Sequence, residues 1–85
     1  MTVTLYVGNL PWTVTEDELA EAFSKIGRVG DVRIIVDHHT GRSRGYGFVE
    51  VEGVELQEAI GAMEGVELRG RRLTIGPAAP RPRRH

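Results

Sequence analysis

Hydrophobic residues along the chain recur with two different periods, and each stretch of one period predicts one element of secondary structure. Stretches rich in β-branched residues, or alternating between apolar and polar positions, predict strands. Four such stretches lie at residues 4–7, 29–37, 46–51 and 71–75. Apolar residues spaced three and four apart predict two helices, one from Thr15 to Gly27 and one from Leu56 to Gly65. The predicted order is strand, helix, strand, strand, helix, strand.

The two predicted helices differ in how well their sequences suit a helix. Thr15 and Glu18 form a capping-box pattern, and the acidic residues after Thr15 favour the positive end of the helix dipole. The second helix carries Gly61 in its interior, which costs about 1 kcal/mol relative to alanine. We therefore expect the second helix to be the less stable of the two.

Each predicted helix has one apolar face, so both should pack on the same face of a four-stranded antiparallel sheet. A ferredoxin-like split βαβ arrangement satisfies this order with right-handed crossovers. The sequence thus predicts an α+β fold with βαββαβ order. We expect one domain over residues 1–76, followed by a flexible or extended Pro/Arg tail over 77–85.

Alternation along the strands predicts which side chains face away from the helices. Tyr6 lies between Leu5 and Val7, so it faces outward if those two residues face the core. The same reasoning places Tyr46 and Phe48 on the outer face. Three of the chain's five aromatic residues would then lie on a sheet face that no helix covers. Several exposed aromatic residues on one surface are typical of a binding site.

The charge distribution changes the meaning of the net charge of −1, which by itself argues against a nucleic-acid partner. Residues 1–76 hold 12 acidic and 8 basic residues, whereas the tail adds three arginines and no acid. We expect Arg33 and Arg72 on the outer sheet face, and Arg42 and Arg44 in the loop before the third strand. An aromatic sheet face with arginines suits single-stranded nucleic acid, because rings stack on bases and arginines contact phosphates.

Two short segments carry a resemblance to a known family. The segment Leu5–Leu10 is similar to the hexapeptide of the RNA recognition motif family, and Arg44–Val51 is similar to its octapeptide. Each segment lies on the expected strand, and the resemblance covers residues 3–76. Val51 departs from the pattern, which usually has an aromatic residue there. That position should face the core, so the departure concerns packing rather than binding.

The resemblance implies roles for individual residues. Tyr6 and Phe48 would stack on bases, Tyr46 would pack between sugars, and Arg44 would pair with a phosphate. Asn9 is also counted among the RNA-binding residues and is expected to brace the turn after the first strand.

The resemblance also implies a protein that binds single-stranded RNA and has no enzymatic activity, no cofactor and no small-molecule substrate. We expect a monomer and, from the likeness to small RNA-binding proteins of bacteria, a cytoplasmic location. Single-stranded DNA and a protein-binding variant of the fold remain alternatives. The protein-binding variant carries Arg-x-Phe before the last strand, whereas residues 66–71 lack phenylalanine. An acylphosphatase-like enzyme needs an arginine in the loop at residues 9–14, which has none.

Other features point away from metal and membrane functions. The chain has no cysteine, so a hydrophobic core must stabilise it without a disulfide or a Cys-zinc site. His38 and His39 are adjacent and point apart in an extended chain, so we expect no metal site. No apolar stretch approaches the roughly 18 residues of a membrane span, and we expect no signal peptide. We expect Trp12 to seal the edge of the core rather than to bind a base.

Overall fold

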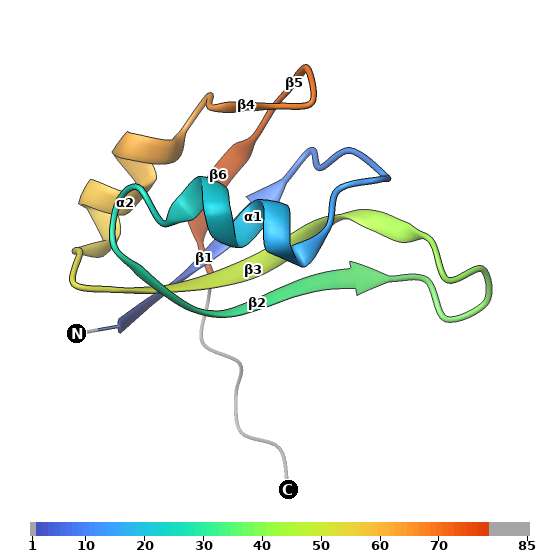
Figure 1. Cartoon of the computed structure of the whole chain (residues 1–85), viewed down its shortest axis with the longest axis horizontal. Coiled ribbons are helices and arrows are strands. Elements are labelled where there is room, and N and C mark those ends of the chain that lie inside the picture. The colour runs from blue at the N-terminus through green and yellow to red at the C-terminus, as the bar shows by residue number, and fades with distance from the viewer. Residues whose placement is uncertain (1, 79–85) are drawn as a thin grey trace, which may run out of the picture.

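Two helices pack on one side of a four-stranded antiparallel sheet, as the sequence predicted (Figure 1). The computed structural model describes residues 2–78. At residues 43 and 44 it describes the backbone only. The elements in chain order are β1 (Thr2–Gly8), α1 (Glu16–Phe23), β2 (Arg28–Val36), β3 (Ser43–Glu52), α2 (Leu56–Met63), β4 (Glu67–Leu68), β5 (Arg71–Arg72) and β6 (Thr74–Pro77). The sheet order β2-β3-β1-β6, with every neighbouring pair antiparallel, confirms the ferredoxin-like α+β prediction.

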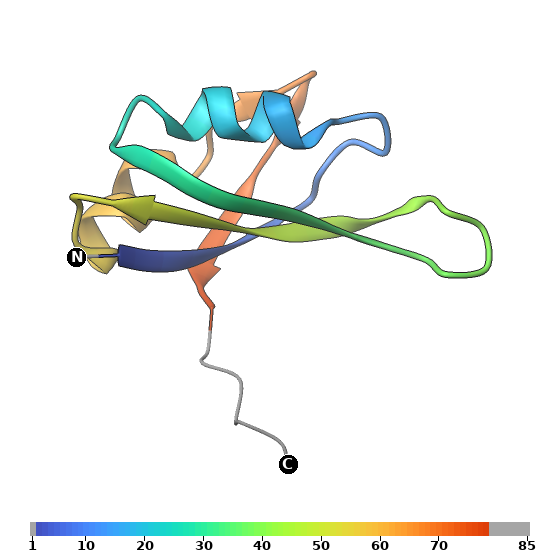
Figure 2. The same cartoon turned by 60° about the horizontal axis from the view of Figure 1, so that its bottom comes forward.

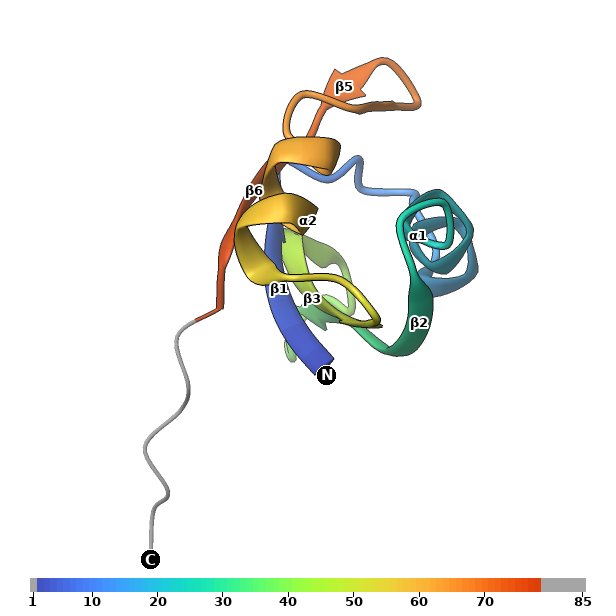
Figure 3. The ribbon, with the colours of Figure 1, turned by 90° about the vertical axis from the view of Figure 1, so that its left-hand side faces the viewer.

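The helices divide the sheet between them. Helix α1 packs against β2 and β3, whereas α2 packs against β1 and β6 (Figure 3). Within the described residues, no helix lies over the opposite face of the sheet (Figure 2). One face is therefore closed by the core, and the other face is open.

The apolar core lies between the sheet and the two helices. Leu5 and Val7 of β1, with Val49 and Val51 of β3, are completely buried. Four helical residues meet them from above, namely Leu19, Phe23, Ala59 and Met63. Each strand and each helix has a single apolar face, and these faces together form one core cluster.

The capping box predicted at the start of α1 is confirmed. Oγ1 of Thr15 accepts a hydrogen bond from the backbone N–H of Glu18 at 3.1 Å, and Oε1 of Glu18 accepts one from the N–H of Thr15 at 2.9 Å. The helix is shorter than predicted, because it ends at Phe23. Ile26 lies in the following turn and still packs against the core. Glycine is needed at position 27, because a Cβ there would lie 2.6 Å from a carbonyl oxygen of β3.

The single strand predicted at residues 71–75 is wrong, because the structure divides it. Strand β5 pairs with β4 in a separate hairpin, whereas β6 pairs with β1. The break falls at Leu73, whose N–H donates to the carbonyl of Val66 at 2.9 Å rather than to β1. The hairpin turns at Arg69 and Gly70, which have φ values of 52° and 83°, as a two-residue type I′ turn requires.

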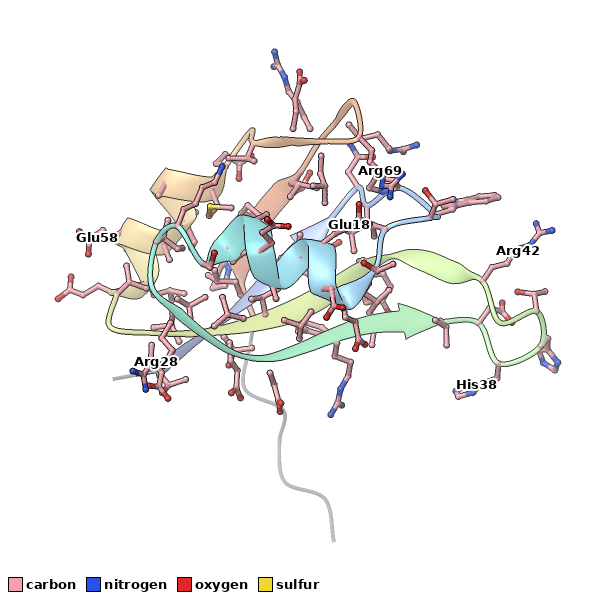
Figure 4. All side chains as sticks on the ribbon, viewed as in Figure 1. Glu18, Arg28, His38, Arg42, Glu58 and Arg69 are labelled. Atoms are coloured by element: carbon pink, nitrogen blue, oxygen red, sulfur yellow. The ribbon has the colours of Figure 1, made fainter. Side chains whose placement is uncertain are left out.

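An ion pair joins this hairpin to α1. Nη2 of Arg69 lies 2.7 Å from Oε2 of Glu18, and its Nε donates to the same oxygen at 2.9 Å (Figure 4). The hydrogen bond from Arg69, followed by that from the backbone of Thr15, lowers the pKa of Glu18 below its ordinary value. One carboxylate therefore caps α1 and also holds the β4–β5 turn.

The last strand extends further than predicted. Pro77 belongs to β6 and pairs with Leu5, and the N–H of Ala78 donates to the carbonyl of Thr4 at 3.2 Å. Proline is tolerated there because β6 is an edge strand. Pro77 and Ala78, the first two residues of the predicted tail, are thus hydrogen-bonded or paired to β1. The rest of the predicted tail, residues 79–85, lies outside the described residues. Between residues 2 and 78, no helix is long and apolar enough to cross a membrane.

We expect Gly61→Ala to stabilise the protein by about 0.5–1 kcal/mol, because alanine has the higher helix propensity. A Cβ at Gly61 would have no atom within 4 Å, so the new methyl group meets nothing. Helix α2 has no side-chain cap, because Glu55 at its N-cap position makes no capping hydrogen bond. Its stability should therefore depend on the helix propensity of its interior residues. Urea unfolding at unchanged m-value measures the effect.

The control is Gly47→Ala, for which we expect the opposite sign. A Cβ at Gly47 would collide with the backbone carbonyl of Arg33 and approach the Cα of Ile34 at 3.1 Å. Overpacking of this kind costs about 1–3 kcal/mol. A Gly61→Ala variant no more stable than the wild type would show that propensity does not limit α2.

Candidate nucleic-acid interface

Three aromatic rings, which we call the aromatic triad, gather on the open face of the sheet. They are Tyr6 of β1 and Tyr46 and Phe48 of β3. The ring centroids of Tyr6 lie 5.8 Å from Tyr46 and 6.1 Å from Phe48, and those of Tyr46 and Phe48 lie 6.2 Å apart. Their flanking residues Leu5 and Val49 are buried, so the outward orientation predicted by alternation is confirmed.

Each ring of the triad is half-buried, so it is fixed by its neighbours and still presents surface to solvent. Phe48 packs edge-on against both tyrosines, with interplanar angles of 65° and 90°. Tyr6 leans along its own strand over Gly8, because Oη of Tyr6 lies 2.6 Å from where a Cβ at Gly8 would be. Any side chain at Gly8 would displace this ring. The glycine therefore positions the triad.

Asn9 directly follows β1, and its side chain joins this segment to the β4–β5 hairpin. Its backbone is in the left-handed region with φ of 60°, which asparagine tolerates better than most residues. Its Nδ2 donates to the carbonyl of Arg72 at 2.7 Å, and its Oδ1 accepts from Nη2 of Arg71 at 2.8 Å. The Asn9 side chain therefore links the segment after β1 to β5, and its role in RNA binding stays a prediction.

Arg71 is a candidate residue that the sequence reasoning missed. Strand alternation assigned Arg72 to the outer face of the sheet, but the structure places Arg72 in the separate hairpin, with Nε 4.0 Å from Oε2 of Glu67. Arg71 instead reaches the end of β1, where Gly8 pairs with Tyr46. Only the long-range bond to Asn9 reveals this, because the two adjacent arginines look alike in the sequence.

Of the other predicted arginines, Arg33 lies on the open face as expected. It is exposed, and it pairs in register with Phe48 of the triad. Arg42 lies in the loop between β2 and β3 and is also exposed. The side chain of Arg44 lies outside the described part of the structure.

Beside Phe48 the open face forms a groove of about 720 Å³. Its polar lining includes Thr4, Arg33, Asp31 and Glu50. A β-bulge creates this arrangement, since the register shifts by one residue between β2 and β3, so that two residues, one of them Asp31, lie opposite Glu50. The open face is therefore aromatic at the β1–α1 end and bears charged hydrogen-bonding groups at the other.

The expectation for Trp12 is wrong. Trp12 is 66% exposed. The neighbouring residues cover the edge of the core instead, since Leu10 is 1% exposed, Val14 is 6% exposed and Pro11 is buried. The guanidinium carbon of Arg42 lies 5.9 Å from the centroid of the indole ring. Trp12 and Arg42 belong to two loops and are 30 residues apart in the sequence, so no local sequence pattern indicates that they meet.

Titratable residues elsewhere do not form a metal centre in the described part of the chain. No three His, Cys, Asp or Glu residues between positions 2 and 78 are placed to hold a metal ion. His38 and His39 are exposed in the β2–β3 loop, which extends away from the helices (Figure 4).

We expect Asn9→Ala to destabilise the protein by about 1–3 kcal/mol. The substitution removes two hydrogen bonds, at about 0.5–1.5 kcal/mol each, and places alanine in the left-handed region. Asn9→Gly is the matched control, because glycine keeps the backbone conformation and loses only the hydrogen bonds. Thermal unfolding of both variants separates the two contributions. Equal stability of all three proteins would contradict a bracing role for Asn9.

Comparison with known proteins agrees with this geometry. The RNA recognition motif family matches residues 5–74. The chain is 44% identical over 81 residues to the chloroplast 29 kDa ribonucleoprotein A of Nicotiana sylvestris, covering 94% of this chain and 30% of that protein. It is 45% identical over 80 residues to RbpE of the cyanobacterium Nostoc, covering 93% of this chain and 81% of RbpE.

Solved structures show the same fold. The RNA-binding protein PG1 superposes with a TM-score of 0.83 at 40% identity, over 95% of this chain and 99% of that one. The Rna15 RRM with bound RNA (GU) superposes with a TM-score of 0.77 at 31% identity, over 91% of this chain and 83% of that one. The chain spans less than a third of the length of the 29 kDa ribonucleoprotein. It is a member of the RNA recognition motif family.

Proposed function

We propose that the protein binds single-stranded RNA on the open face of its sheet. The observation that carries this proposal is the aromatic triad, three half-exposed rings within 6.2 Å of one another on a face that no described helix covers. Bases have flat π surfaces that stack on such rings, whatever their sequence. Support comes from the Rna15 RRM, which was solved with bound RNA, and from the ribonucleoprotein relatives.

Within this proposal each residue has a distinct role. Tyr6 and Phe48 stack on successive bases, and Tyr46 packs between the sugars. Arg33 lies beside Phe48 in the sheet, where its guanidinium can pair with a phosphate. Arg42 and Arg71 add positive charge at the other end of the triad, and Arg44 is proposed to pair with a phosphate. Arg72 contributes less than the sequence suggested, because its guanidinium lies near Glu67. Asn9 acts on RNA through the position of Arg71.

Charge is distributed unevenly over the molecule. Acidic residues lie on the helical side, among them Glu16, Asp17 and Glu21 of α1 and Glu58 of α2. Although residues 1–76 carry a net charge of −4, the arginines near the triad attract a polyanion locally, whereas Asp31 and Glu50 make part of the open face acidic. The proposed binding is therefore directed to the sheet by local rather than net charge. That the protein is a cytoplasmic monomer without enzymatic activity stays a prediction.

We expect Phe48→Ala to weaken binding of single-stranded RNA by about 1–3 kcal/mol, the value of one lost stack, with little change in stability. Fluorescence anisotropy with labelled homopolymer RNAs and the matched DNAs measures affinity and the preference between RNA and DNA. Unchanged affinity, or an unfolded variant, would contradict the proposed role of Phe48.

Two variants provide a matched electrostatic control. Arg33→Gln and Lys25→Gln each remove one positive charge, the first on the open face and the second, also exposed, just after α1. We expect only the first to weaken binding. Equal effects would show that the whole protein charge matters rather than its placement.

We also expect deletion of residues 79–85 to reduce the salt dependence of binding. Ala78 is part of the groove beside Phe48 and Thr4, so the chain leaves the described structure at the edge of the open face. The deletion removes Arg81, Arg83 and Arg84. If two to three of them contact phosphate, the slope of log K against log salt should decrease by roughly 1.5–2, at about 0.7 per contact. An unchanged slope would show that these arginines do not contact the RNA.

A further inference from the structure

Trp12 is the most exposed large hydrophobic residue of the described chain, at 66%, followed by Val36 at 43%. Its exposure does not result from a loose loop, because the residues on both sides are anchored. Leu10 is 1% exposed, Val14 is 6% exposed, and the N–H of Val14 donates to the carbonyl of Pro11 at 3.2 Å. The indole is thus held outside the core by a segment that is itself packed.

The same segment is attached to the strand that carries two rings of the triad. The N–H of Leu10 donates to the carbonyl of Gly45 at 2.9 Å, and Gly45 directly precedes Tyr46. The loop between β1 and α1 and the β2–β3 hairpin lie at the same end of the sheet (Figure 1). The loop that carries Trp12 is therefore attached to β3 at the Tyr46 end of the triad.

Arg42 provides a cation at the same place. Its guanidinium carbon lies 5.9 Å from the indole centroid, and its backbone is fixed by two hydrogen bonds. The N–H of Asp37 donates to its carbonyl at 2.7 Å, and its own N–H donates to Oγ1 of Thr40 at 3.2 Å. The ion pairs found between residues 2 and 78 are Glu18–Arg69 and Glu67–Arg72, so no carboxylate there neutralises Arg42 (Figure 4).

We propose that Trp12 and Arg42 form a rim subsite, which binds one further nucleotide of the same single strand. The base stacks on the exposed indole, and the guanidinium pairs with the phosphate. This inference rests on the proposed function and adds a contact outside the sheet. A nucleotide fits the pair because it combines a flat π surface with an anion, which are the two groups that an indole and a guanidinium recognise.

The test uses two independent measurements on the whole chain. Anisotropy of labelled eight-nucleotide homopolymer RNAs reports binding, and intrinsic fluorescence reports the rim subsite, because Trp12 is the only tryptophan. We expect the indole emission to change in parallel with the anisotropy. Trp12→Ala should weaken binding about 5- to 150-fold, the range for one lost stack, and Trp12→Phe should retain part of the affinity. Arg42→Gln should also weaken binding and reduce the salt slope by about 0.7.

Val36→Ala is the control, because Val36 is the other exposed large hydrophobic residue and lies at the end of β2, outside the rim subsite. It should bind RNA as the wild type does. The rim subsite is overturned, and the proposed function stands, if RNA binds through Phe48 while the indole emission stays constant and Trp12→Ala binds normally. If the wild type binds no single-stranded RNA, anisotropy shows no change at all, and both proposals are overturned.

Discussion

The register between β1 and β3 is the constraint on which the site depends. Tyr6 pairs with Phe48, and Leu5 pairs with Val49, so one face of this ladder is aromatic and the other is aliphatic. A slip of one residue would place the rings in the core and the aliphatic residues in solvent. Burial of the aliphatic face against the two helices therefore fixes the rings on the open face. Folding and presentation of the site result from the same hydrogen-bond ladder.

Glycines allow the strands to approach as closely as this arrangement needs. Gly47 has no room for a Cβ, because the backbone of β2 passes directly against it. Gly8 leaves the space into which the Tyr6 ring leans. Both belong to the two short segments by which the sequence resembles the family. Their role in positioning the rings is steric, because each glycine leaves space that a side chain would fill.

The hairpin of β4 and β5 contributes to the site from outside the sheet. It is tied to α1 through Glu18 and Arg69 and to the end of β1 through Asn9. Because both links involve hydrogen-bonded side chains, the hairpin has a defined position although its strands are only two residues long. This position is what brings Arg71, rather than Arg72, to the end of the triad.

The sequence by itself determined the element order, the capping box at Thr15 and the outward orientation of the triad. These features depend on residues within a few positions of one another, and alternation and helical spacing are local properties. Tertiary structure decided what depends on distant backbone partners. The bond from Leu73 to Val66 divided the last predicted strand, and the packing of Leu10 and Val14 left Trp12 exposed beside Arg42. No local pattern could predict these two features, because each depends on which residues distant in the sequence accept a hydrogen bond or fill the core.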